Sequence, residues 1–222
     1  MINLKAFFSS FESKPGTVSK KYISKYLPKN PVIIEAGAHI GLDTYEMAKM
    51  WPGAKIFAFE PIPELFQKLV KTTSSFPNVK CFQMALGDET GFCNINLSSG
   101  ASDGSSSLLE PKEHIVHHPE VFFQNQLEVE VITLHDWMMK NEVEKIDFFW
   151  LDLQGFELNV LKKAESILAN TKVIYTEVSI VENYRGGALY QELKTWLESI
   201  GFSVNKEEIP WKDGGNVLFI KD

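Results

Sequence analysis

The sequence predicts an α/β domain with a mostly parallel β-sheet and helices on both faces. Short apolar segments alternate with amphipathic segments of helical periodicity along most of the 222 residues, which is the pattern of repeated strand–helix units. The segment at 146–152 is apolar almost throughout, as expected of a strand that is buried on both faces of a parallel sheet. A chain of this length suits one such domain with a small extension.

The first half of the chain begins with an extension and then enters the strand–helix alternation. Residues 1–30 are predicted to form a helical extension, because apolar residues fall at helical spacing before Pro28 and Pro31 end it. The domain itself is expected over residues 31–222. Its first strands are predicted at 32–35, 55–60 and 79–84, and its first helices at 41–50 and 63–73.

The middle of the chain interrupts this alternation. Residues 91–97 alternate in polarity like an exposed strand, and residues 98–107, which we call the serine loop, are small and polar. Residues 109–127 contain two prolines and three histidines and have weak helical character. We interpret residues 98–127 as an insertion, and ordered loops of this composition often lie over a binding site. A flexible surface loop is the alternative interpretation of the serine loop.

Regular alternation resumes in the second half of the chain. The strands are predicted at 128–133, 146–152, 172–178, 202–206 and 215–220, and the helices at 134–141, 156–169 and 188–200. The last two strands follow each other closely and are expected to form a hairpin.

The charge of the chain argues against nucleic acid as a partner. The net charge is -7, from 22 basic and 29 acidic residues, and Arg185 is the only arginine. Arginine is the preferred bidentate ligand for phosphate, and no basic stripe is visible. No segment approaches the ~20 apolar residues that a membrane-spanning helix needs. The N-terminus also lacks the apolar run of a signal peptide, so a cytoplasmic location is expected.

No metal site is predicted. His114 and His117 have the spacing of a His-x-x-His pair, but there is no clear third ligand. These histidines are interpreted as surface residues of the insertion. The sequence does not indicate an oligomeric state.

The segment from Pro31 to Gly41 predicts a nucleoside-binding turn. A buried strand leads into Gly37 and Gly41, and such a turn lets a ligand approach bare backbone. A dinucleotide fingerprint would need glycine at positions 37, 39 and 42, but His39 and Leu42 occupy the last two. An NAD-dependent oxidoreductase is therefore the disfavoured alternative. S-adenosylmethionine, a nucleoside without a pyrophosphate, satisfies the pattern.

Acidic residues follow five predicted strands in succession. In an open α/β sheet, ligands bind beyond the carboxyl ends of the strands, so these side chains are expected to converge on one pocket. A carboxylate about 20 residues beyond the glycine turn is placed to hold a ribose diol. Convergent carboxylates suit a cationic sulfonium cofactor and a hydroxyl-bearing acceptor. The five acids are Glu35, Glu60, Asp88, Asp152 and Glu177.

Several short motifs follow one another along the chain. They are Glu35-x-Gly-x-x-x-Gly41, Phe57-Ala-Phe-Glu-Pro61, Ala85-Leu-Gly-Asp88, Val131-Ile-Thr-Leu134, Asp152-x-Gln-Gly-x-Glu157 and Thr176-Glu-Val-Ser179 before Tyr184. In this order and spacing, they resemble the motifs of the FkbM family of class I S-adenosylmethionine-dependent methyltransferases, and the resemblance covers nearly the whole chain. It implies a Rossmann-like fold with seven strands, the last one antiparallel, and O-methylation of a sugar, glycan or small natural product.

The resemblance also implies roles for individual residues. The Gly37–Gly41 loop, which contains His39, should lie along the methionine and ribose parts of the cofactor, and Glu60 should hold the ribose. Further cofactor-binding candidates are Glu35 for the loop or the methionine ammonium, Asp88 or Asp103 for the adenine amino group, and Asp152. The candidates for the catalytic base are, in order, Asp152, Glu177 and His39. The acceptor-binding candidates are Gln154, Glu157 and Tyr184, with Tyr184, Trp211 and Phe122 as possible stacking faces for a sugar ring.

Structural interpretations of the same residues stay open. Asp152 could be a helix N-cap, and Glu157 could be an acid that interacts favourably with the dipole of its helix. A catalytically silent module with the same fold, which binds a partner or a glycan, is the remaining alternative to an enzyme.

Overall fold

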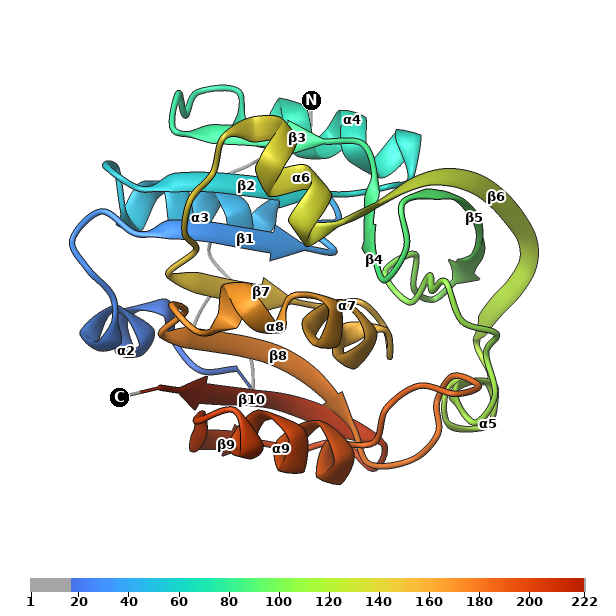
Figure 1. Cartoon of the computed structure of the whole chain (residues 1–222). Coiled ribbons are helices and arrows are strands. Elements are labelled where there is room, and N and C mark those ends of the chain that lie inside the picture. Colours follow the sequence, from blue (N-terminus) through green and yellow to red (C-terminus); the bar gives the residue numbers. More distant parts are fainter. Residues whose placement is uncertain (1–16, 222) are drawn as a thin grey trace.

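The computed structural model describes residues 17–221, and its centre is a seven-stranded sheet (Figure 1). The strand order is β3-β2-β1-β7-β8-β10-β9. Every neighbouring pair is parallel except the two pairs that β10 makes with β8 and β9, which are antiparallel. The predicted fold is thereby confirmed. The strands are β1 (Val32–Ala36), β2 (Lys55–Phe59), β3 (Val79–Phe82), β7 (Phe148–Leu151), β8 (Val173–Ser179), β9 (Ser203–Glu208) and β10 (Gly214–Ile220).

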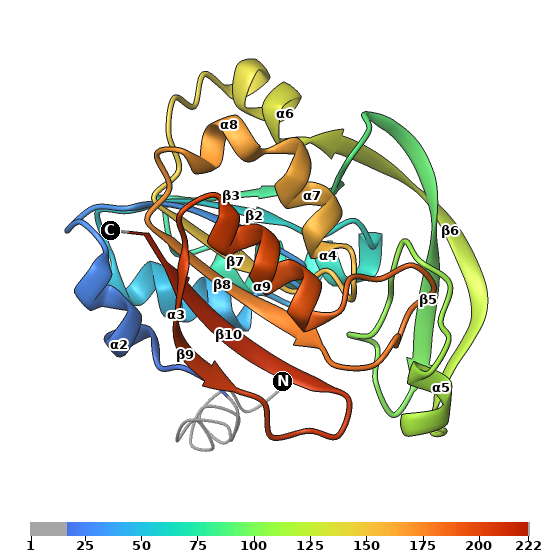
Figure 2. The ribbon, with the colours of Figure 1, turned by 60° about the horizontal axis from the view of Figure 1, so that its bottom comes forward.

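Helices cover both faces of the sheet, because successive side chains of each central strand point to opposite faces. In β2, Ile56 and Ala58 face α3 and α4, whereas Phe57 and Phe59 join the core under α6. The two sets of helices lie on opposite sides of the sheet in Figure 2. Their bounds are α2 (Lys20–Ile23), α3 (Leu42–Met50) and α4 (Pro63–Thr73) on one face, and α6 (Leu134–Asn141), α7 (Glu157–Lys163), α8 (Glu165–Leu168) and α9 (Tyr190–Ser199) on the other.

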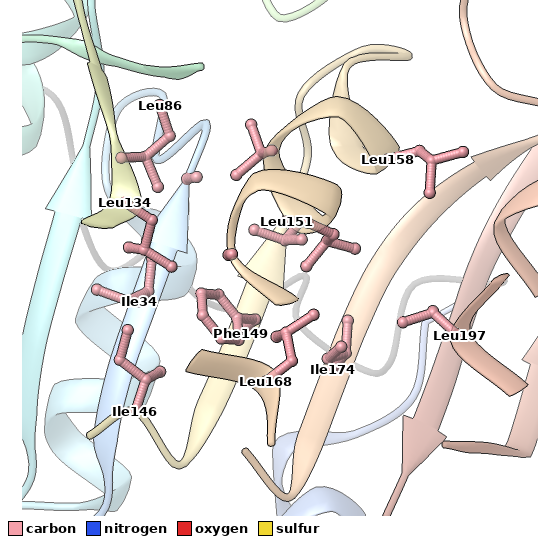
Figure 3. Packing of buried hydrophobic residues seen from close by; sticks show 14 of the residues in the cluster. Ile34, Leu86, Leu134, Ile146, Phe149, Leu151, Leu158, Leu168, Ile174 and Leu197 are labelled. Atoms are coloured by element: carbon pink, nitrogen blue, oxygen red, sulfur yellow. The ribbon is translucent and has the colours of Figure 1, made fainter. Parts of the chain in front are cut away.

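The larger core lies between the sheet and the second set of helices. Side chains from β1, β7 and β8 meet those of α6 to α9 there, and Figure 3 shows several of them closely packed. Trp137 of α6 is fully buried and makes edge contacts with the rings of Phe57, Phe59 and Phe82. Edge-to-face aromatic contacts of this kind add to the area that the rings bury.

The region predicted as an insertion contains little helix, which corrects its predicted helical character: its two ends belong to strands, and most of residues 101–120 form turns and loops. A second sheet has the order β4-β6-β5 and contains β4 (Ala85–Gly87), β5 (Gly91–Gly100) and β6 (Val121–Thr133). The only helix within residues 98–127 is the short α5 (His114–His117). The prediction was wrong here because residues 124–126 are polar and show no strand periodicity. They are extended because β6 pairs antiparallel with β5, a contact between distant segments.

Other boundaries also differ from prediction. The helix expected at 156–169 is divided into α7 and α8, because Ala164 leaves the helical conformation. Among residues 17–30 of the predicted N-terminal extension, residues 20–26 form helix, as α2 and the 3₁₀ helix η1 (Ser24–Tyr26), and residues 1–16 lie outside the described part. Within residues 17–221, no helix combines the length and the apolar character required to span a bilayer.

Candidate active site

A cavity of about 920 Å³ lies at the carboxyl edge of the main sheet. It is bordered by the ends of β1, β2, β7 and β8, by the serine loop, and by residues 17–21. Figure 1 shows the second sheet beyond the arrowheads of β1 and β8, on the side of this edge. The position agrees with the rule for ligand sites in open α/β sheets. The volume lies within the range typical of small-molecule sites.

The turn after β1 brings bare backbone into contact with the end of β7. Gly37 has a φ of +82°, and a Cβ at this position would lie 1.9 Å from the carbonyl oxygen of Asp152. The N–H groups of Gly37 and Ala38 both donate to the Phe59 carbonyl of β2. Gly41, also at +82°, is the N-cap of α3, and a Cβ there would meet the Leu69 side chain at 2.7 Å. Gly37 lines the cavity, whereas Gly41 lies behind it.

Glu60 is positioned at the cavity by two backbone donors. The N–H of His39 donates to Oε2 and the N–H of Ile62 donates to Oε1, each at 2.9 Å. Each carboxylate oxygen can accept about two hydrogen bonds, so both retain capacity for a ligand hydroxyl. Burial raises the pKa of Glu60 to about 7, against the effect of the two backbone donors.

Glu35 also lines the cavity, at the end of β1. Its side chain is almost fully buried, and the hydroxyl of Thr44 donates to Oε2. Burial, followed by the nearby negative charge of Asp43, raises the pKa of Glu35 to about 8. A cation in the cavity would favour the ionised form of this carboxyl group.

The structure separates the two candidates for adenine recognition. Asp103 of the serine loop lines the cavity, and its Oδ1 lies 2.9 Å from Nε2 of His39. Asp88 does not line the cavity and accepts a hydrogen bond from Asn159 at 3.3 Å. Asp88 is displaced because the chain leaves the main sheet after Phe82, so that residues 85–87 join the second sheet instead.

At the ends of β7 and β8, Gln154 joins two carboxyl groups. Its Nε2 donates to Asp152 Oδ1 at 2.7 Å and to Glu177 Oε2 at 2.6 Å. All three residues line the cavity. Gln154 has a φ of +52°, a left-handed conformation that is costly for a residue with a side chain and that recurs at functional sites.

The two carboxyl groups share the electrostatic environment of the cavity. The Asp152 side chain is accessible from the cavity yet surrounded by protein, and the loss of hydration raises its pKa, with the Gln154 hydrogen bond opposing the shift. Loss of hydration also raises the pKa of Glu177 well above its ordinary value, and the charges of Asp152 and Glu157 add to this effect. Burial thus raises the pKa of both carboxyl groups, which brings each closer to the range in which a carboxylate can accept a proton near neutral pH.

Glu157 and Tyr184, two of the predicted acceptor-binding residues, lie behind the cavity wall. Glu157 Oε1 accepts from the N–H of Leu153 at 2.7 Å, and it stabilises the turn between β7 and α7. Burial raises the pKa of Glu157 to about 7. The buried Tyr184 places its hydroxyl 2.7 Å from Gln154 Oε1. Among the three predicted acceptor-binding residues, only Gln154 lines the cavity.

Residues 17–21 form a cavity wall that the sequence did not indicate. The N–H of Val18 donates to the Tyr175 hydroxyl at 3.2 Å, across 157 positions of sequence. Lys20 pairs with Asp43 and lies 4.5 Å from the centre of the Trp150 ring. No local sequence pattern announces contacts over such a separation.

Apolar side chains complete the opposite part of the cavity, and these were also missed. Their orientation depends on strand register and on the second sheet, neither of which can be read from a single segment. An apolar wall beside a buried carboxylate suits a purine nucleoside. The residues are Phe59, Ile62, Leu65, Met84, Ala85, Leu86 and Leu108.

Comparisons with solved structures agree with the fold. The chain resembles the fibrillarin pre-rRNA processing protein of Methanococcus jannaschii with a TM-score of 0.54 and 15% identity, over 88% of this chain and 68% of that one. It resembles SMU.1697c of Streptococcus mutans, a putative methyltransferase in complex with SAH, with a TM-score of 0.53 and 14% identity, over 95% of this chain and 99% of that one. At these identities the likeness concerns the fold alone.

Comparisons of sequence identify the family. The model of the methyltransferase FkbM domain matches residues 35–204. The chain is 30% identical to the 2-O-methyltransferase NoeI of Sinorhizobium fredii over 174 residues, which are 76% of this chain and 72% of that protein. It is 26% identical to the methyltransferase sdnD of Sordaria araneosa, over 83% of this chain and 78% of that protein.

S-adenosylmethionine is the cofactor of the family, and the cavity fits it. The turn at Gly37 offers backbone without a side chain, Glu60 retains acceptor capacity for ribose hydroxyls, and Glu35 offers a carboxyl group for a cation. The match to the methyltransferase family model excludes the alternative of an NAD-dependent oxidoreductase. This chain belongs to the FkbM family of S-adenosylmethionine-dependent methyltransferases.

Proposed function

We propose that this methyltransferase transfers the methyl group to a hydroxyl oxygen of a sugar, a glycan or a small natural product. The observation that supports the proposal best is the pair of carboxyl groups, Asp152 and Glu177, at the cavity beyond β7 and β8. A hydroxyl is a weak nucleophile near neutral pH, and a carboxylate within reach can accept its proton. The 2-O-methyltransferase activity in the name of one relative is consistent with the same chemistry.

The residues around β1 and β2 would hold the cofactor. Glu60 would accept hydrogen bonds from the ribose hydroxyls, the Gly37 turn would contact the ribose and methionine parts, and Glu35 would face the methionine ammonium. Asp103, already in contact with His39, is the candidate for the adenine amino group. When bound, the cofactor supplies an electrophilic methyl group on a positively charged sulfur.

Asp152 is the proposed catalytic base. Its pKa is raised, which brings the carboxylate closer to the basicity that is most effective near neutral pH. The proton of the acceptor hydroxyl would pass to Asp152 as the oxygen is methylated. Glu177, whose pKa is also raised by burial, is the second candidate for the base. His39 ranks third, because its Nε2 is already engaged by Asp103.

The acceptor would enter between the serine loop and the wall formed by residues 17–21. Trp211 lines the cavity and is 46% exposed, so its ring offers a face on which a sugar could stack. Tyr184 is buried and Phe122 lies outside the cavity lining, so neither presents a stacking face there.

The proposal is tested by transfer of a labelled methyl group. The protein is incubated with methyl-labelled S-adenosylmethionine and with separate glycan, lipid, small-metabolite, protein and RNA fractions. We expect base-stable label in a glycan or metabolite fraction, and its loss in Asp152→Ala while calorimetry still detects cofactor binding. Label on RNA or protein nitrogen would overturn the proposal. Cofactor binding without label in any fraction would favour the silent binding module instead.

A further inference from the structure

Gln154 uses its whole amide group in hydrogen bonds. The two N–H groups of Nε2 are directed to Asp152 and Glu177, and Oε1 accepts from the Tyr184 hydroxyl at 2.7 Å. These partners also fix the orientation of the amide, because carboxylate oxygens need a donor and a hydroxyl can supply one. A glycine would adopt the φ of +52° more easily. The side chain therefore has a role that offsets the cost of its backbone conformation.

Tyr184 holds the amide from behind. Its ring packs against the rings of His114 and Phe123, with centroids 5.4 Å and 6.3 Å away. It also lies close to Gly155, where a Cβ would come within 3.3 Å of the ring. The Tyr184 hydroxyl lies 2.7 Å from the carbonyl oxygen of Ser105 as well as from Gln154, so its single proton can serve either acceptor.

The serine loop is attached to the same turn. The Ser107 hydroxyl donates to the Gln154 carbonyl oxygen at 2.8 Å. Gln154 is therefore held through its side chain by Tyr184 and through its backbone by the serine loop. A side chain fixed at both ends has a defined position before any ligand binds, which lowers the cost of reaching a productive geometry.

The surrounding charges make the spacing of the two carboxyl groups important. Two carboxylates at close range do not both ionise readily, and a proton is shared between them. A donor between them relieves part of the repulsion and favours ionisation of the group it contacts. The charged and titratable groups that act on the pair from neighbouring elements are Glu157 of α7, Asp43 of α3, Asp213 before β10 and His39 of the turn after β1.

We propose that Gln154, held by Tyr184, is a positioning residue that fixes the separation of Asp152 and Glu177 and holds Asp152 in place for its proposed role as the base. The kinetic part of this proposal rests on the proposed O-methyl transfer, whereas the arrangement of the carboxyl pair can be tested without turnover.

The first test is a carboxyl titration by NMR of the ¹³C-labelled protein saturated with S-adenosylhomocysteine. In the Gln154→Met variant, which keeps the length but removes the hydrogen bonds, the titration midpoint of Asp152 should rise by about one pKa unit. Asn159→Leu is the matched control, because it removes a side-chain amide from α7 that bonds Asp88 outside the cavity. It should leave both midpoints unchanged. Unchanged midpoints in Gln154→Met would overturn the proposal.

The second test uses the acceptor fraction that takes up label. Gln154→Met should lower kcat by about 10- to 100-fold, change the affinity for S-adenosylhomocysteine less than about 3-fold, and move the rising limb of the pH–rate profile to higher pH. Tyr184→Phe, which keeps the packed ring, should show the same changes at smaller size. An unaltered pH profile in both variants would refute the positioning role. If the wild-type protein labels nothing, O-methyl transfer fails, and the titration alone decides the role of Gln154.

Discussion

The turns after β1 and β7 are neighbours at the carboxyl edge of the sheet, and they use the same backbone conformation differently. Each contains a residue with a side chain at positive φ, His39 at +49° and Gln154 at +52°. In the β1 turn the important donor is the His39 backbone N–H, which holds Glu60. In the β7 turn the important donor is the Gln154 side chain, which holds Asp152 and Glu177. The proposed cofactor side thus depends on the shape of the backbone, and the proposed catalytic side depends on side-chain chemistry.

The largest expected effect is a loss of stability when Gly37, at the tight contact between the two turns, is substituted. Gly37→Ala combines left-handed strain with a clash against the Asp152 backbone, and should cost about 3 kcal/mol or more in the free energy of unfolding, or prevent folding. Gly186→Ala is the matched control, since Gly186 has a φ of +74° with nothing within 4 Å of the added carbon. It should cost only the strain, about 1–2 kcal/mol. Urea unfolding measures the free energy of unfolding of both variants. Equal losses of stability in Gly37→Ala and Gly186→Ala would contradict a close contact between the two turns.

Removing the charge of Glu60 should have the next largest effect and should act on cofactor binding. Glu60→Gln keeps the side-chain shape but weakens hydrogen bonds to the ribose hydroxyls, and we expect the affinity for S-adenosylmethionine to fall about 10- to 100-fold. Calorimetry measures the change. Gln154→Met, on the other side of the comparison, should leave this affinity nearly unaltered. An unchanged affinity in Glu60→Gln would exclude the ribose role.

The Glu60→Gln variant also tests, in the absence of cofactor, whether burial raises the pKa of Glu60. The pKa of Glu60 rises on folding from an ordinary value of 4.5 to about 7, so the folded protein keeps the proton over this interval while the unfolded chain loses it. The stabilisation is full below pH 4.5 and is lost as pH rises toward 7. Relative to Glu60→Gln, the wild type should lose about 1.4 kcal/mol of unfolding free energy per pKa unit of the shift. Parallel pH profiles of urea unfolding would contradict the burial of this carboxyl group.

The smallest effect is expected from the side chain of His39. Asparagine tolerates positive φ, so His39→Asn should preserve the backbone donor to Glu60 and lose only the contact with Asp103. Exposed polar contacts of this kind contribute little, about 0.2–1 kcal/mol, so the affinity for S-adenosylhomocysteine should fall less than about 5-fold. Asp103→Asn should lower the affinity more than His39→Asn does, because it also weakens the proposed bond to the adenine amino group. A loss of turnover with intact binding would instead make His39 the base.

The predicted elements were most accurate where the signal is local. The helix at Pro63–Thr73 has proline in its first turn, and the helix at Leu134–Asn141 has Thr133 as its N-cap, so both boundaries were predicted correctly. The rule for strand ends correctly brought Asp152 and Glu177 to one cavity. It misplaced Asp88, because the strand that precedes it belongs to the second sheet. The wall at residues 17–21 depends on contacts across more than a hundred residues, and no local pattern encodes it.

The contact between Gly37 and the Asp152 carbonyl has a consequence for how this scaffold can diversify. With no space for even one carbon between the two turns, a side chain at Gly37 cannot tune the distance from the glycine turn to the proposed base without displacing the Asp152 backbone. New acceptors must then be accommodated by remodelling the outer walls, at the serine loop and around Trp211. The two turns would then keep one catalytic geometry while the outer walls of the cavity vary, so that the same scaffold could serve unrelated hydroxyl compounds.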